Sequence, residues 1–148
     1  MLGLVLAREL RLLEASLKPL EITTKPDMPR GTFFSTVKAA DIGVSPAELA
    51  VAETGTVIIA ASDESERLVT ALPKIHVVVV PRSRLVSSLA DAEPRISRFL
   101  AGASRGVVVS LISGPSKTAD IGGMLVVGVH GPGELHVCLL DQELREES

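Results

Sequence analysis

The stretch TVIIAASDESERLVTALPKIHVVVVP, residues 56–81, decides the fold. Its two ends, residues 56–61 and 76–80, are short apolar runs rich in β-branched side chains, which is typical of strands buried on both faces. Between them the sequence predicts a helix over residues 64–72, which Pro73 ends. A strand, a helix and a second strand in this order predict an α/β fold with a mostly parallel sheet and helices on its faces.

The same alternation continues on both sides of this stretch. Residues 40–44 predict a short strand. Ser45, Pro46 and Glu48 then have the pattern of a helix N-cap, first position and third position, so we expect a helix over 46–53 that ends at Gly55. Further helices are predicted over 82–92 and from Pro94, and a strand over 106–112. The apolar runs 124–129 and 134–140 are expected to pair as an antiparallel hairpin around a glycine-rich turn.

The first 38 residues have a different pattern. Leu6, Leu10, Leu13 and Leu17 recur at helical spacing, which predicts an amphipathic helix that ends before Pro19. Residues 25–38 are rich in breakers and predict a long irregular link whose two phenylalanines dock on the body of the protein. We therefore divide the chain into residues 1–38, an amino-terminal helix and link, and residues 39–148, an α/β domain. Such a long link suggests a mobile arm, or a region that is truncated or incomplete.

Composition excludes several classes of function. The chain has 148 residues, enough for one domain with a substantial core, and 46% of them are hydrophobic. The net charge is −3 and no basic block occurs, so we expect neither nucleic acid nor a membrane surface as a partner. No apolar run reaches the length of a membrane span. The expected location is cytoplasmic.

The sequence contains a single cysteine, Cys138. One cysteine can form neither an internal disulfide nor the ligand set of an iron–sulfur cluster, and we predict no cofactor for this chain. Its position inside an apolar run predicts a small buried side chain. The alternative is a catalytic thiol that uses His136, two residues away on the same strand face.

Three polar loops follow or precede predicted strands: residues 52–56, 113–120 and 129–136. Ligands of open α/β sheets bind beyond the carboxyl ends of strands, so we expect residues near 54, 116 and 130 to meet at one mouth. In the second loop, small residues let the backbone approach a ligand, Ser116 and Thr118 offer hydroxyls, and Lys117 offers a positive charge. A helix beginning there would attract an anion at its amino terminus. The loop lacks the P-loop spacing, and the alternative is a structural turn in which Asp120 is only a cap.

The remaining polar residues support weaker hypotheses. Glu53 could act as a base or nucleophile, or be an exposed glutamate at the end of a helix. Thr54 and Thr56, on either side of Gly55, could bind a ligand or shape the turn. His130, Glu134 and His136 suggest a metal site, but no further ligand is evident at a familiar spacing, so we predict no metal and expect His130 to be a polar group at the cleft mouth. We expect His76 to be a strand-end residue without a chemical role.

Three segments together carry a family resemblance: AADIGVSPAELAVAETGTVIIA, LPKIHVVVVP and SLISGPSKTADIGGMLVVGVHGPGELHVCLLD, which span residues 39–141. They resemble the LUD-domain family. The resemblance implies a three-layer α/β fold similar to the ribose-phosphate isomerase and CoA-transferase group. It also implies a non-redox component in the oxidation of L-lactate to pyruvate, beside iron–sulfur partner subunits.

The resemblance further groups residues into one cleft for a small anionic ligand. The matched positions are Glu53, Thr54, Gly55, Ser113, Gly114, Pro115, Ser116, Thr118, Asp120, His130, Gly131 and Pro132. Lys117 stands where the family often has arginine, which keeps the charge and loses the two-pronged geometry. Family members usually have further strand–helix units before residue 39, and a sheet without them would expose apolar surface, which favours a homodimer or a partner.

Three functions are therefore considered. The first is the non-redox subunit just described. The second is a stand-alone enzyme, similar to CoA transferases or sugar-phosphate isomerases, in which Glu53 is the nucleophile or base and Lys117 helps to hold the anion. The third is a scaffold whose loops are only structural.

Overall fold

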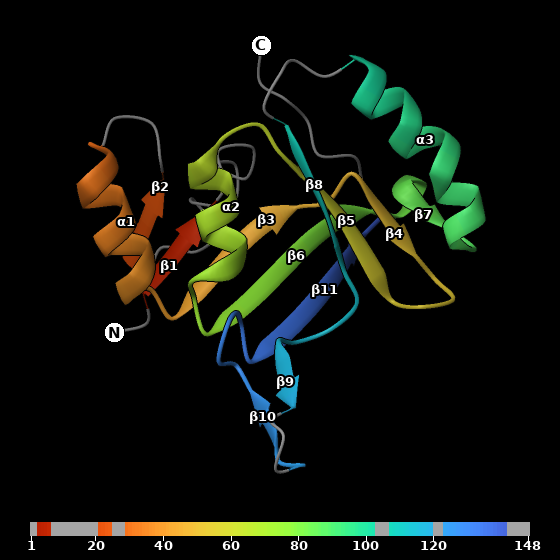
Figure 1. Cartoon of the computed structure of the whole chain (residues 1–148). Helices are drawn as coiled ribbons and strands as arrows, with labels where there is room; N and C mark the ends of the chain where they lie inside the picture. Colours follow the sequence, from red (N-terminus) through yellow and green to blue (C-terminus); the bar gives the residue numbers. More distant parts are fainter. Residues whose placement is uncertain (1–2, 7–20, 25–28, 103–106, 120–122, 142–148) are drawn as a thin grey trace.

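The structure is a computed structural model that describes residues 3–6, 21–24, 29–102, 107–119 and 123–141. A parallel sheet runs through its centre (Figure 1). The strands of this sheet, in spatial order, are β11 (Glu134–Leu140), β6 (Ile75–Pro81), β3 (Ile42–Pro46), β1 (Gly3–Leu6) and β2 (Glu21–Thr24). All four neighbouring pairs among the described strands are parallel. The predicted α/β class with a mostly parallel sheet is confirmed.

Two helices, α1 (Arg30–Ala39) and α2 (Glu64–Ala71), pack together beside this sheet (Figure 1). Phe33 and Val37 of α1 form a buried cluster with Val69 of α2. Where α2 crosses β3, the sheet carries Gly43, and an added Cβ there would lie 2.2 Å from the carbonyl oxygen of Val69. The packing distance between α2 and the sheet therefore depends on a residue without a side chain.

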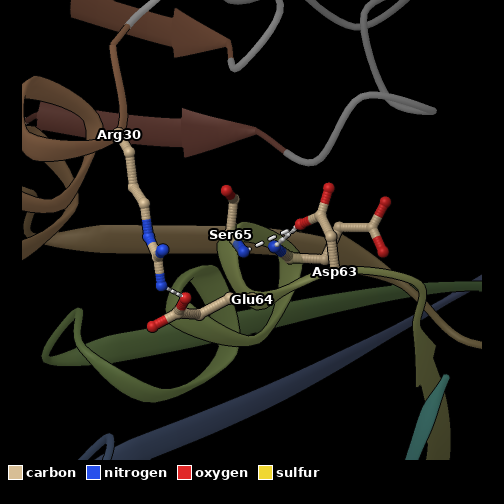
Figure 2. Close-up of polar contacts among 5 residues, drawn as sticks. Arg30, Asp63, Glu64 and Ser65 are labelled. Atoms are coloured by element: carbon tan, nitrogen blue, oxygen red, sulfur yellow. Dashed lines mark hydrogen bonds and ion pairs between the residues drawn. The ribbon is translucent and has the colours of Figure 1, made fainter. Parts of the chain in front are cut away.

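The start of α2 is fixed by polar contacts (Figure 2). The Asp63 carboxylate accepts hydrogen bonds from the backbone N–H groups of Ser65 and Glu66, at 2.8 and 3.1 Å, and so caps the helix. Glu64, in the first turn, forms an ion pair with Arg30 of α1. The predicted helix over 64–72 is confirmed, and its cap also fixes where it begins.

A second sheet lies against the first. Its strands, in spatial order, are β7 (Leu85–Val86), β4 (Leu49–Val51), β5 (Thr56–Ala61) and β8 (Val108–Ile112). β4 and β5 are antiparallel, and so are β5 and β8. The two strands of the stretch 56–81 therefore belong to different sheets, with α2 connecting them. The central core lies between the sheets and includes Val57 and Ile59 of β5 with Val78 and Val80 of β6.

The helix predicted over 46–53 is wrong. Those residues finish β3, cross to the second sheet and form β4. The Ala47 N–H donates to the Val79 carbonyl in the first sheet, and the next N–H, of Glu48, donates to the Ile58 carbonyl in the second. All three residues of β4 are buried. Pairing between two sheets thus overrides the helical propensity of an alanine-rich segment.

The helices predicted over 82–92 and from Pro94 are also wrong in their boundaries. Residues 82–84 form a 3-10 turn, β7 pairs with β4, and one helix, α3 (Leu89–Gly102), then runs through Pro94. Ser88 and Asp91 cap its start reciprocally, because the Asp91 N–H donates to the Ser88 hydroxyl and the Asp91 carboxylate accepts from the Ser88 N–H. Ala92 of α3 is buried on the face of the second sheet that points away from the first.

The antiparallel pairing of 124–129 with 134–140 is wrong. β10 (Leu125–Val127) pairs instead with β9 (Lys117–Ala119), and β11 joins β6 in parallel. Lys117 therefore lies in a strand, and the helix considered after the second loop does not form over 117–119. The β9–β10 hairpin projects away from both sheets (Figure 1).

Two expectations about the amino-terminal region need correction. Residues 3–6 form β1 rather than part of a helix, and Leu10, Leu13 and Leu17 lie outside the described residues. The irregular link predicted over 25–38 is wrong from residue 30 on, where α1 begins. Phe33 is buried as expected, whereas Phe34 is 45% exposed. The division of the chain at residue 38 stays a prediction.

Burial at the edges differs from the expected pattern. β8 and β11 are terminal strands of their sheets, and much of each is exposed to solvent. Cys138, in β11, is exposed, so its predicted burial is wrong. Among the described residues, no helix combines the length and the apolar character that crossing a membrane requires.

Candidate functional site

A cavity of about 250 Å³ lies where the carboxyl-terminal end of α2, the start of β6 and two of the predicted loops meet. Residues 114–116 of the second loop and 130–132 of the third line it together. Thr70 of α2, His76 of β6 and Ser110 of β8 add further polar side chains to its lining. The structure thus brings together two of the three segments that were expected at one mouth. In the parallel sheet this mouth lies at the amino-terminal ends of β6 and β11, so the expected position beyond the carboxyl ends of its strands is wrong.

Backbone contacts hold these two loops against each other. The Ser116 N–H donates to the Pro132 carbonyl at 2.8 Å, and the Gly128 N–H donates to the Ser116 carbonyl at 2.9 Å. A Cβ on Gly131 would lie 3.2 Å from the Cβ of Ser116, which is tighter than an ordinary contact. The Gly133 N–H donates to the Lys74 carbonyl and anchors the third loop beside β6. The glycine-rich composition of the third loop therefore serves close approach.

Several polar side chains of the cavity have no partner within the described part of the chain. The hydroxyls of Ser110 and Ser116 and the imidazole of His130 form no hydrogen bond or ion pair with any residue that the structure describes. Hydroxyl and imidazole N–H groups can donate to a carboxylate or another small oxyanion. The cavity thus offers several unengaged donors to one ligand.

His76, which was expected to be a strand-end residue without a chemical role, lies in β6 and lines the cavity. It is 1% exposed, and its Nε2 atom lies 2.8 Å from the Oγ atom of Ser45, which is itself buried. Burial lowers the pKa of His76 to about 4, so the imidazole is neutral at neutral pH. The Ser45 hydroxyl fixes the orientation of a neutral ring in the wall of the cavity. Ser45 therefore acts as a strand residue, and its expected role as a helix cap is wrong.

The first predicted loop, residues 52–56, does not line the cavity but is linked to it by a chain of hydroxyl groups. Thr54 Oγ1 lies 2.6 Å from Thr56 Oγ1, which lies 2.8 Å from Ser113 Oγ. Thr56 is buried, and Gly55 between the two threonines has a φ angle of +65°, which favours glycine. Ser113 directly precedes the cavity residue Gly114. Thr54 and Thr56 support the second loop and do not line the cavity.

Other predicted site residues lie apart from the cavity. Glu53 is exposed in the turn between β4 and β5, and its N–H donates to the Ser87 carbonyl. Lys117 and Thr118 are part of β9, next in sequence to Ser116 but outside the cavity lining. Asp120 lies outside the described residues.

His136 and His130 do not face each other across a hairpin, because β10 and β11 are not paired. His136 Nε2 lies 3.1 Å from Glu134 Oε2 on the exposed surface of β11. Within the described ranges, no group of three histidine, cysteine or acidic side chains is placed to hold a metal ion.

Sequence comparison places these features in a family. A family model described as LUD domain matches residues 9–140. Lactate utilization protein C of Shouchella clausii is 38% identical over 93 residues, which are 63% of this chain and 41% of the relative. Lactate utilization protein C 1 of Bacillus mycoides is 37% identical over 72% of this chain and 46% of its own length. In Bacillus subtilis, lactate utilization protein C is 38% identical over 63% of this chain and 39% of the relative. The chain thus spans less than half the length of these relatives.

Structural comparison agrees on the fold. A solved DUF162 family protein from Deinococcus radiodurans superimposes with a TM-score of 0.59, covering 93% of this chain and 87% of that one. The sequence identity is 18%, so the likeness concerns the fold.

Proposed function

Because the chain belongs to the LUD domain family, we propose that it is a non-redox component of an L-lactate utilization system and binds a small carboxylate in the cavity at Ser116 and His130. The names of the relatives from Shouchella clausii and Bacillus mycoides support the biological role. The unengaged donors of the cavity support the ligand class. Lys117, the first residue of β9, follows Ser116 directly and adds a positive charge next in sequence to the cavity, outside its lining.

The observation that carries this proposal is the joining of two sequence motifs around one cavity. Ser116 is bound through its backbone N–H to Pro132 and through its carbonyl to Gly128, so the backbones of the two motifs are held side by side at the cavity. Carboxylate oxygens would accept hydrogen bonds from the Ser110 and Ser116 hydroxyls and from the His130 imidazole. His76, neutral and fixed by Ser45, would form a polar wall beside them that adds no charge.

We place the redox chemistry in partner subunits. The sequence holds one cysteine, and iron–sulfur clusters are bound by several thiolates. A docking surface for such a subunit is offered by the β9–β10 hairpin, which projects from the body of the protein (Figure 1). Its large exposed apolar residues are Met124, Leu125, Val126, Val127 and Val129. Contiguous exposed apolar side chains of this kind mark interaction sites.

Calorimetric titration with L-lactate tests the ligand, with L-lactamide as a neutral molecule of similar shape. We expect saturable binding of lactate and weaker binding of lactamide. Ser116→Ala and His130→Gln should each weaken lactate binding about fivefold, since a lost hydrogen bond costs about 1 kcal/mol. His136→Gln is the matched control, because His136 lies outside the cavity. Equal binding of lactate and lactamide, or an equal loss in the control, would contradict the proposal.

A genetic experiment tests the biological role separately. Deletion of the gene should prevent growth on L-lactate as the carbon source and leave growth on glucose unchanged. The tagged protein should co-purify with iron–sulfur subunits. Normal growth of the deletion strain on lactate would contradict the role even where lactate binds.

A further inference from the structure

A second cavity, of about 280 Å³, lies between α3 and the second sheet. It shares no lining residue with the cavity at Ser116 and His130. Leu49, Ile58 and Val109 line it from the sheet, and Ile96 and Phe99 line it from α3. Leu49 and Ile58 are buried, so the floor of this cavity is apolar.

The lining also contains three charged residues, Glu48, Arg84 and Arg95, and they differ in whether they have a partner in the protein. Arg84 is already engaged, because its Nη1 atom lies 3.5 Å from Glu48 Oε2 and donates to the Ala47 carbonyl at 3.2 Å. Arg95 forms no hydrogen bond or ion pair with any described residue. Among the described residues, the Arg95 guanidinium therefore has no counter-charge, and it lies beside an apolar floor.

We propose that this cavity binds an amphiphilic monoanion, a carboxylate with a short aliphatic chain. The guanidinium fork of Arg95 matches the two oxygens of a carboxylate. The aliphatic chain lies against Ile96 and Phe99, where its burial removes apolar surface from water. The charges of Glu48, Arg84 and Arg95 sum to +1, so a monoanion neutralises the lining. A more highly charged anion would leave an excess of negative charge. The volume is at the low end for a ligand pocket, where about 300 Å³ is the usual minimum, so the chain is short.

Calorimetry or NMR titration with octanoate, below its micelle concentration, tests this site. We expect saturable octanoate binding and at least tenfold weaker binding of octanol and octylammonium. Arg95→Ala should weaken octanoate binding about tenfold, as expected for a charge-assisted hydrogen bond. Arg98→Ala is the matched control, because Arg98 lies on the same helix, outside the cavity, and donates to the Pro94 carbonyl. Ala60→Phe, which fills the cavity from β5, should abolish binding with the thermal unfolding transition retained.

The outcomes separate this site from the lactate site. Arg95→Ala should leave L-lactate binding unchanged, and His130→Gln should leave octanoate binding unchanged. The proposal is overturned if octanol binds as tightly as octanoate, if Arg98→Ala weakens binding as much as Arg95→Ala, or if the folded wild-type protein shows no saturable binding at millimolar octanoate. If the Ala60→Phe variant does not fold, the Arg95→Ala and Arg98→Ala variants decide the test, because both change exposed side chains.

Discussion

Ser45 of β3 and His76 of β6 share a buried hydrogen bond, with Oγ and Nε2 2.8 Å apart on neighbouring parallel strands. The pair lies at the boundary between the core and the cavity, because His76 also lines the cavity wall. A neutral imidazole is required there, since burial disfavours the charged form.

The first prediction concerns the pH dependence of stability. The pKa of His76 is about 4 in the folded protein and 6.5 in the unfolded chain, so the unfolded state binds more protons between these values. The contribution of His76 to the free energy of unfolding is complete above pH 6.5 and falls by up to about 3 kcal/mol as the pH drops toward 4. Urea unfolding at several pH values measures it. His76→Gln should flatten the dependence in this range, and His136→Gln, on the exposed surface, should not.

A second prediction concerns Gly43. Gly43→Ala would place a methyl group 2.2 Å from the Val69 carbonyl oxygen and 2.9 Å from Pro73 Cγ, so α2 must move away from the sheet. We expect a loss of about 2–3 kcal/mol in the free energy of unfolding, the size of an overpacked core. Gly31→Ala is the control, because nothing lies within 4 Å of its added Cβ in α1. It should be neutral or stabilising by about 0.5 kcal/mol. Equal stability of the two variants would refute the close packing.

The third prediction tests whether the hydroxyl chain supports the cavity. Thr56→Val keeps the buried shape of the side chain and removes the contacts to Thr54 and Ser113. It should cost about 1 kcal/mol in stability and weaken lactate binding, because Ser113 precedes the cavity residue Gly114. Combined with Ser113→Ala in a double-mutant cycle, the two changes should be non-additive. Additive effects would show that the two hydroxyls act independently.

A fourth prediction concerns the β9–β10 hairpin. Leu125→Lys and Val127→Lys should abolish co-purification with iron–sulfur subunits and leave the thermal unfolding temperature within a few degrees, because both side chains are exposed. Arg98→Glu, also exposed but on α3, is the control. Unchanged association of both hairpin variants would place the partner elsewhere. Loss of a self-associated species in analytical ultracentrifugation would instead assign the surface to a second copy of the chain.

The fifth prediction decides the enzymatic alternative. If the isolated protein turned over an acyl-CoA or a sugar phosphate, Glu53→Gln should abolish that turnover while keeping the fold. The exposed position of Glu53, outside the cavity that Ser116 and His130 share, leads us to expect no such turnover. Measurable activity lost in Glu53→Gln and retained in Glu48→Gln would establish the alternative.

Local signals were sufficient for the elements of the stretch 56–81. Asp63 precedes the helical run and caps it, and Val78, Val79 and Val80 of β6 are buried between neighbouring strands. Residues 46–51 gave an equally good local signal for a helix, yet β4 forms because Ala50 pairs with Val57 across the second sheet. Whether a segment has such a partner cannot be read from its own residues.

The candidate site could be predicted only where the motif residues lie in the loops themselves. Ser116 and His130 belong to glycine- and proline-rich loops, which mark close backbone approach, and both line the cavity. His76 carries no such signal, because its importance arises from the pairing of β3 with β6, which sets Ser45 beside it. The available signals were a polar residue, His76, in a run of valines and a second polar residue, Ser45, in another buried run.

The parallel pairing of β6 with β11 joins segments that are roughly sixty residues apart in the chain, and such distant contacts form late in folding. During translation, the edge of β6 on which β11 later pairs stays open to solvent until residues 134–140 have left the ribosome. The interval is several seconds at ordinary elongation rates, roughly 5–20 residues per second. Protection of that edge by a chaperone during this interval would therefore raise the yield of folded protein.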